Sequence, residues 1–306
     1  MLTLFPYTTL FRSSSSSGAT SSSGTSGATS SGASGTSGSS GTSGSSGTSG
    51  ASGTSGSSGT SGSSGSTSSG GTDGGALGKL VPGDSTLTFN VAGNARKVIL
   101  HVPAQVGAGT IPLVIALHGN GDQNTNFVAT SGIKALADKD GFVLAAPQGI
   151  TQNITVGTQT VPNVDWDAYR TVAQGNIDLP LLQAIQSQLT GTGSIDLKHV
   201  IVYGYSQGGY MSFRYGMDAA ATLACSAVLA AGQPISGLIT AAARKIPVAI
   251  QIGDQDFGIA GARQTKTALD ANGNPNSYLE IAGAGHVPIP GDPAAPLEWC
   301  RGQSLP

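Results

Sequence analysis

Short apolar runs alternate with longer amphipathic segments over most of the chain after residue 75. The runs have strand length and are rich in aliphatic and β-branched residues. They lie at residues 86–91, 95–102, 111–117, 141–147, 200–203, 225–231, 247–252 and 277–281. Segments with helical spacing lie at residues 126–139, 179–189, from 208 onward, and 259–271, with Asp178 expected as an N-cap. This alternation predicts an α/β fold with a doubly wound, mostly parallel sheet flanked by helices.

Two parts of the pattern depart from simple alternation. The first two strands are separated only by a Gly93-Asn94 turn, which predicts an antiparallel opening pair. Residues 148–176 are polar for most of their length and contain Trp166 and Tyr169. We expect this excursion to shape any pocket, with the two aromatic residues either lining the pocket or packing beneath it.

The N-terminal composition is different. Residues 14–75 are almost wholly Ser, Gly, Thr and Ala, and Asp73 is their only charged residue. Such a segment cannot bury enough apolar surface to fold, so we expect a disordered tether ahead of a domain at residues 76–306. Glycine recurs at every third position from 32 to 65, but the tract has no proline, which argues against a collagen-like helix.

The first thirteen residues do not have the pattern of a signal peptide. No basic residue precedes the apolar ones, and Pro6 and Arg12 interrupt them. Thr3 to Ser13 matches the translation of a widely used sequencing-adapter oligonucleotide. We therefore expect residues 1–13 to be non-native and the natural N-terminus, with any export signal or anchor, to be lost.

Charge and cysteine content narrow the function classes. The 306 residues contain 14 Lys and Arg against 16 Asp and Glu, and no basic cluster occurs, which argues against nucleic acid and anionic membranes as partners. The apolar runs are too short for a transmembrane segment. Cys225 and Cys300 have no metal-site spacing, so they form either one disulfide or two buried thiols.

The motif with the clearest chemistry is Gly204-Tyr205-Ser206-Gln207-Gly208, which directly follows the apolar strand at 200–203. A serine on a sharp strand-to-helix turn needs glycines two residues away on either side, where side chains would clash. A chance match in this glycine-rich chain is the alternative. The N-terminal tract at residues 32–65 cannot supply the motif, because its glycines recur every three residues and the motif needs two glycines four residues apart. The strand and the helix also stand in the required order around Ser206. Ser206 is therefore the candidate nucleophile.

A serine nucleophile needs a base and a carboxylate that orients the base. Asp254 and Asp256 follow the strand at 247–252, and His286 follows the last strand. The order Ser, Asp, His is the one found in α/β-hydrolases. We predict Ser206, Asp256 and His286 as the triad, with Asp254 as the alternative acid. Whichever aspartate does not orient the base is free to bond the loop backbone.

Three other histidines compete for the role of base. His101 lies in an N-terminal strand, and His199 opens the nucleophile strand at its opposite end. His118 stands at the correct sheet edge, in His118-Gly119-Asn120, and we expect it to brace the loop that contains Asn120. The predicted oxyanion hole consists of Gln207, which follows the nucleophile, and Asn120. Asp122 either ties this loop down or is a solvated turn residue.

Three stretches together resemble the α/β-hydrolase superfamily, and within it the secreted polyhydroxybutyrate depolymerase, feruloyl esterase and acetylxylan esterase-like group. They are residues 117–122, 141–149 and 196–212, and the likeness covers about residues 85–290. The resemblance implies ester hydrolysis through an acyl-serine, with no metal or organic cofactor. The motif around Ser206 is shared with carboxylesterase and lysophospholipase-like relatives, and the cysteine framework of fungal members is absent.

The resemblance and the tether lead to one preferred function and three alternatives. We expect a secreted or cell-surface esterase for feruloyl or acetyl esters of plant polysaccharide, with a polymeric substrate. The alternatives are a polyester depolymerase, a carboxylesterase or lysophospholipase-like hydrolase, and a non-catalytic surface protein with a degenerate hydrolase domain.

Overall fold

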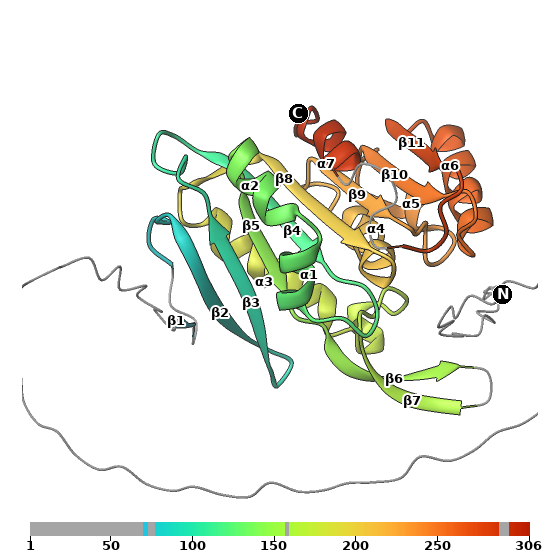
Figure 1. Ribbon diagram of the computed structural model, residues 1–306, viewed down its shortest axis with the longest axis horizontal. Helices are drawn as coiled ribbons and strands as arrows, with labels where there is room; N and C mark the ends of the chain where they lie inside the picture. Colours follow the sequence, from blue (N-terminus) through green and yellow to red (C-terminus); the bar gives the residue numbers. More distant parts are fainter. Residues whose placement is uncertain (1–69, 73–76, 157–158, 288–293) are drawn as a thin grey trace, which may run out of the picture. The chain divides into compact units, whose positions relative to one another are not determined.

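A single large β-sheet organises the fold in the computed structural model, which describes residues 70–72, 77–156, 159–287 and 294–306. The sheet has nine strands in the order β1-β2-β3-β5-β4-β8-β9-β10-β11 (Figure 1). Its strands are β1 (Gly70–Thr72), β2 (Gly83–Val91), β3 (Asn94–Val102), β4 (Ile111–Leu117), β5 (Val143–Pro147), β8 (Ile195–Tyr205), β9 (Cys225–Leu229), β10 (Val248–Gly253) and β11 (Asn276–Ile281). The pairs β2/β3 and β3/β5 are antiparallel, and the others are parallel. The predicted fold class is confirmed.

Helices cover both faces of the sheet. The helices are α1 (Asn124–Thr130), α2 (Ile133–Asp140), α3 (Asp178–Thr190), α4 (Gln207–Asp218), α5 (Leu238–Ala241), α6 (Ile259–Asn272) and α7 (Ala294–Arg301). Apolar residues of α1, α2 and α7 share one buried cluster, and those of α3, α4, α5 and α6 share the other. Among the described residues, no helix combines the length and apolarity needed to cross a bilayer.

The central strand β4 shows why the sheet must be covered on both sides. Leu113, Ile115 and Leu117 belong to one buried cluster, while Val114 and Ala116 belong to the other. Successive side chains of a strand point to opposite faces, so a continuous apolar run fills two cores at once. This explains why β4 is an unbroken apolar run in the sequence.

The segment predicted as one helix at 126–139 is two helices. α1 ends at Thr130 and α2 begins at Ile133, with Gly132 at φ 73° between them. A positive φ breaks a right-handed helix, and glycine adopts it without steric cost. The apolar periodicity continues through the break, so the sequence pattern alone does not reveal it.

The predicted N-cap of α3 is also wrong. Asp178 is the first residue of the helix, and Oδ1 of Asn176 accepts the backbone N–H groups of Asp178 and Leu179, each at 2.9 Å. The Asp178 carboxylate is fully buried and pairs with Arg96 at 2.8 Å. The carboxylate that the sequence pattern predicted as a helix cap therefore forms a long-range ion pair instead.

Three residues within the predicted tether pair with the main sheet. Gly70–Thr72 form β1, which pairs in parallel with β2 at Leu87 to Phe89. Backbone hydrogen bonding to a neighbouring strand requires no apolar side chains, so composition does not reveal it. The predicted non-native segment 1–13 and the tether up to residue 69 lie outside the described residues.

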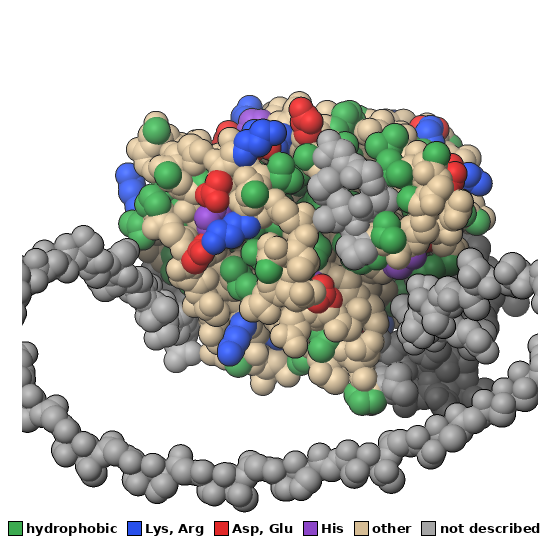
Figure 2. Space-filling view, viewed as in Figure 1, with side chains coloured by type: hydrophobic (Ala, Val, Ile, Leu, Met, Phe, Trp, Pro, Cys, Tyr) green, Lys and Arg blue, Asp and Glu red, His purple; other side chains and the backbone are tan. Residues whose placement is uncertain are grey.

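The polar excursion forms a hairpin beside the main sheet. Strands β6 (Ile150–Val156) and β7 (Gln159–Asp165) pair antiparallel, and a short 3₁₀ helix (Val172–Gln174) follows them. Figure 1 shows this hairpin extending from the lower edge of the fold, below the carboxyl end of β8. On the face drawn in Figure 2, acidic and basic side chains are interspersed rather than gathered by sign.

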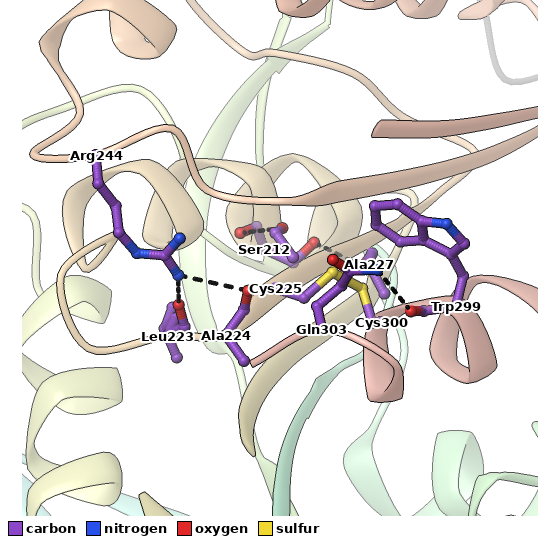
Figure 3. The surroundings of a disulfide bond; sticks show 10 residues. Ser212, Leu223, Ala224, Cys225, Ala227, Arg244, Trp299, Cys300 and Gln303 are labelled. Atoms are coloured by element: carbon purple, nitrogen blue, oxygen red, sulfur yellow. Dashed lines mark hydrogen bonds between the residues drawn. A yellow bond between two sulfur atoms is a disulfide. The ribbon is translucent and has the colours of Figure 1, made fainter. Parts of the chain in front are cut away.

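Cys225 and Cys300 form a disulfide, which decides between the two alternatives left open by the sequence. The bond joins the start of β9 to α7, and 75 residues separate the cysteines (Figure 3). Both cysteines are fully buried. The C-terminal helix is thus anchored covalently to the central sheet.

The double variant Cys225→Ala/Cys300→Ala is expected to unfold more easily than the wild type. Losing a cross-link over a loop of this length releases chain entropy in the unfolded state, which costs about 2–5 kcal/mol of stability. Chemical denaturation monitored by circular dichroism measures the difference, and reduction of the wild type serves as the matched condition. An unchanged denaturation midpoint in both cases would show that the bond adds nothing to stability.

Candidate active site

Ser206 occupies a strained turn between β8 and α4. Its backbone has φ 54° and ψ −119°, a combination that non-glycine residues rarely adopt. A Cβ on Gly204 would lie 2.1 Å from the carbonyl oxygen of Gly208, and one on Gly208 would lie 2.3 Å from that of Leu117. Only glycine fits at either position, which is the physical reason for the predicted motif.

Three side chains predicted to act together are in hydrogen-bond contact. Oγ of Ser206 lies 2.8 Å from Nε2 of His286, and Nδ1 of His286 lies 2.7 Å from Oδ2 of Asp256. Ser206 follows β8, Asp256 follows β10 and His286 follows β11, and these parallel strands all end at the same sheet edge. The arrangement can pass a proton from the serine to an imidazole that a carboxylate orients.

Asp254, the alternative acid, has a different partner. Its Oδ1 accepts the backbone N–H of Gly283 at 2.8 Å, and its side chain is exposed. Asp256 is only 2% exposed, and its Oδ1 also accepts the backbone N–H of Gly258 at 2.7 Å. The structure therefore brings Asp256 to His286 and uses Asp254 to hold the turn after β11.

His118 braces the loop after β4. Its Nε2 accepts the backbone N–H of Gly149 at 2.9 Å, so Nδ1 carries the proton and donates to the carbonyl of Gly119 at 2.8 Å. Burial lowers the pKa of His118. A buried, doubly bonded imidazole holds the loop and has no free nitrogen for base catalysis.

The two remaining histidines lie on other contacts. His101 bridges Asp84 and Asp138 at 2.6 and 2.8 Å, between β2, β3 and α2. His199 lies 2.7 Å from Asp196 at the start of β8. Both pair with carboxylates away from Ser206.

The residues predicted for the oxyanion hole lie directly after Ser206 in the chain and in the loop after β4. Gln207 begins α4, where backbone N–H groups have no partner within the helix. Asn120 follows Gly119, and a Cβ on Gly119 would be 3.5 Å from Cβ of Ser206. Asp122 accepts hydrogen bonds from the Gln123 backbone and the Asn126 side chain, so it ties the loop to α1.

Trp166 and Tyr169, the two aromatic residues of the excursion, have different environments. Trp166 is 1% exposed and donates its indole N–H to the carbonyl of His118 at 2.9 Å, so it packs beneath the loop rather than lining a pocket. Tyr169 is 36% exposed. Burial of its hydroxyl raises the pKa of Tyr169, and hydrogen bonding with the Gln207 side chain opposes this shift. Tyr169 alone of the two remains a candidate for substrate contact.

Sequence reasoning missed the aromatic rings around His286. The centroid of the Phe257 ring lies 4.4 Å from the centroid of the imidazole, and the centroid of the Tyr205 ring lies 5.5 Å from it. Phe257 is 48% exposed although it follows the buried Asp256 directly. A phenylalanine immediately after the predicted triad acid is the signal that the sequence offers, but the sequence does not show that its ring is exposed or that it faces the histidine.

Asp165 is a second residue that the sequence did not single out. Burial raises the pKa of its carboxyl from 3.8 to about 6, although hydrogen bonding with the Trp166 backbone and the Asn120 side chain lowers it. Oδ1 of Asp165 is buried without a hydrogen-bond partner. The ionised carboxylate therefore costs stability at neutral pH.

Asp165→Asn is expected to gain stability relative to the wild type as pH rises. A carboxyl with a raised folded-state pKa stabilises the fold fully below about pH 4 and loses that contribution as pH rises through about 6. The amide does not titrate, so the difference in unfolding free energy should grow by about 1–3 kcal/mol between pH 4 and pH 7. Denaturant titrations of both proteins at each pH measure it, and a pH-independent difference would contradict the argument.

In the part of the chain that the structure describes, no group of three or more His, Cys, Asp or Glu side chains is placed to hold a metal ion.

Sequence comparison matches this chain to one family and to two curated proteins. The family described as Phospholipase/Carboxylesterase matches residues 107–286. "Putative esterase NocK" of Nocardia uniformis subsp. tsuyamanensis is 30% identical over 181 residues, covering 56% of this chain and 49% of that protein. "Bifunctional acetylxylan esterase/xylanase XynS20E" of Neocallimastix patriciarum is 25% identical over 234 residues, covering 65% and 32%. The chain thus spans about half or less of the length of these curated relatives.

Solved structures show the same fold at low identity. A thermostable esterase matches with TM-score 0.54 and 21% identity, covering 72% of this chain and 63% of that one. FphF, a fluorophosphonate-binding serine hydrolase of Staphylococcus aureus, matches with TM-score 0.56 and 15% identity, covering 72% and 99%. A ferulic acid esterase matches with TM-score 0.52 and 15% identity, covering 72% and 96%.

Proposed function

The chain belongs to the phospholipase/carboxylesterase family, and on that basis we propose that it is a serine esterase that hydrolyses carboxylic esters through an acyl-serine intermediate. The observation that carries the proposal is the continuous hydrogen-bonded series from Ser206 through His286 to the buried Asp256. This arrangement argues against a degenerate, non-catalytic domain, because such a domain does not need these three side chains in hydrogen-bond contact.

The proposed reaction has two halves. Oγ of Ser206 attacks the ester carbonyl carbon while Nε2 of His286 takes the hydroxyl proton, and Asp256 stabilises the resulting imidazolium. The tetrahedral oxyanion is held by the backbone N–H groups of Gln207 and Asn120. His286 then protonates the departing alcohol, which leaves an acyl group on Ser206. Water, deprotonated by His286, releases the acid and restores the serine.

The preferred substrates are acetyl or feruloyl esters of plant polysaccharide. One curated relative is named as an acetylxylan esterase/xylanase, which supports acetyl esters. The exposed phenyl ring of Phe257 beside His286 supports an aromatic or apolar group on one side of the scissile bond. The buried disulfide supports secretion, because such bonds persist in oxidising compartments.

A second function draws support from the family's own description. Members are described as phospholipases as well as carboxylesterases, so a lysophospholipid or small soluble ester is the competing substrate. Polyester depolymerisation is the third substrate class to be compared with these two.

A substrate panel tests the proposal. Methyl ferulate, acetylated xylan, a polyhydroxybutyrate film, a lysophospholipid and p-nitrophenyl acetate are compared with one preparation, using a Ser206→Ala preparation as the blank. We expect hydrolysis of p-nitrophenyl acetate and the highest kcat/KM on acetylated xylan or methyl ferulate. Preference for the lysophospholipid or the polyester film would replace the substrate assignment, and no hydrolysis above the blank would overturn the proposed function.

A further inference from the structure

The end of strand β7 holds the loop that contains Asn120. The backbone N–H of Gly121 donates to the carbonyl of Val164 at 2.8 Å. Nδ2 of Asn163 donates to Oδ1 of Asn120 at 2.5 Å. One backbone bond and one side-chain bond therefore fasten this loop to a strand that lies outside the main sheet.

The same strand end also contacts the other half of the predicted oxyanion hole. The indole of Trp166 donates to the carbonyl of His118, and the carbonyl of Trp166 accepts Nε2 of Gln207 at 2.8 Å. Residues 163–166 thus touch the loop after β4 and the first residue of α4. The hairpin acts as a common support for two segments that are far apart in sequence.

These contacts decide which part of Asn120 is available to a substrate. Its side-chain oxygen accepts the hydrogen bond from Asn163, and its side-chain amide hydrogen-bonds the carboxyl of Asp165. Within the described residues, the backbone N–H of Asn120 donates to no protein acceptor that would compete with a ligand. The backbone N–H, rather than the side-chain amide, is therefore the group left to face an oxyanion on Ser206.

The Asn163 amide is itself fixed in one orientation. Its Oδ1 accepts the backbone N–H of Val164 at 3.0 Å, which leaves Nδ2 facing Asn120. Gly121 has φ +75°, and a Cβ there would lie only 3.3 Å from Oδ1 of Asn163. Because the loop packs this tightly against the amide, a change at Asn163 is transmitted to the loop.

We propose that Asn163 is a positioning residue for the oxyanion hole: its side-chain amide holds Asn120 so that the Asn120 backbone N–H faces the carbonyl oxygen of an ester on Ser206. This inference rests on the proposed esterase function. Asn163 touches no reacting atom, so its effect is on the orientation of a donor. A merely structural role in the hairpin would change stability without selectively weakening the transition state.

The variants Asn163→Ala and Asn163→Asp test the inference. Alanine removes the donor, while aspartate keeps the shape and the acceptor for Val164 but places an oxygen where the donor stood. Displacing one oxyanion donor should lower kcat by about 10- to 100-fold with KM unchanged. Asn153→Ala is the matched control, because Asn153 is exposed on β6 of the same hairpin.

The decisive readout is affinity for a trifluoromethyl ketone, which forms a tetrahedral oxyanion on the serine. We expect its affinity to fall by the same factor as kcat/KM in both Asn163 variants, and to be unchanged in Asn153→Ala, at temperatures where all the proteins are folded. Wild-type kcat and ketone affinity in Asn163→Asp would overturn the inference, as would a loss confined to KM or to thermal stability. A wild type without esterase activity would instead refute the proposed function.

Discussion

Ser206→Ala is expected to lower kcat/KM for p-nitrophenyl acetate by roughly 10⁴- to 10⁶-fold while leaving the fold intact. Among the described residues the Ser206 hydroxyl bonds only to Nε2 of His286, whose side chain is 18% exposed, so solvent can satisfy that nitrogen when the hydroxyl is removed. Alanine keeps the Cβ that already tolerates the φ of 54°. The loss should therefore be chemical, with an unchanged thermal unfolding temperature.

Ser187→Ala is the matched control for this change, because Ser187 is exposed on α3. It is expected to keep the wild-type rate. If the Ser206 variant hydrolyses the ester at a rate comparable with Ser187→Ala, then another residue is the nucleophile and the mechanism proposed above is wrong.

Asp256→Asn is expected to lower kcat by about 10³- to 10⁴-fold. Oδ2 of Asp256 accepts the Nδ1 proton of His286, and an amide N–H in its place would favour the opposite tautomer of the imidazole. Nε2 would then carry a proton and could not accept one from Ser206. Steady-state kinetics on p-nitrophenyl acetate give the loss, and KM should change little.

Asp254→Asn separates this chemical effect from a general effect on the loop. Asp254 lies two residues away, and within the described residues its side chain bonds only the backbone of Gly283, so its amide variant should stay close to the wild-type kcat. The opposite ranking of the two variants would transfer the acid role to Asp254.

The strand-turn-helix motif at Ser206 was readable from the sequence because its physics is local. Gly204 and Gly208 are required by contacts within a few residues or at one neighbouring strand end. The order of Ser206, Asp256 and His286 was equally informative, because parallel strands bring their carboxyl ends to one edge. Local sterics and sheet topology together were enough to predict which side chains meet.

What the sequence did not reveal depends on contacts between distant segments. Asp178 appears local as an N-cap, yet its carboxylate pairs with Arg96, 82 residues away. For Trp166 the sequence left open whether the ring lines the pocket or packs beneath it, and the bond from its N–H to the carbonyl of His118 decides for packing beneath. Asn163 meets Asn120 only because the hairpin folds against the loop after β4. Hydrophobic periodicity contains no information about such polar pairings.

The disulfide likewise depends on a contact between segments that are distant in the sequence. Two cysteines in an exported domain can pair, but their Cα atoms must come within bonding range, and sequence spacing does not supply that distance. The 5.4 Å between Cα of Cys225 and Cα of Cys300 follows from the packing of α7 beside β9. Because α7 was not predicted, the pairing could not be either.

The central claim is that His286 and Asp256 activate Ser206 as the nucleophile. Its most direct test is peptide mapping by mass spectrometry after inactivation with an organophosphonate ester analogue. We predict that the phosphonyl group is found on Ser206 in proportion to the activity lost, and that Ser206→Ala is not labelled. Inactivation with the label on another residue, or full labelling of Ser206 with activity retained, would contradict the account.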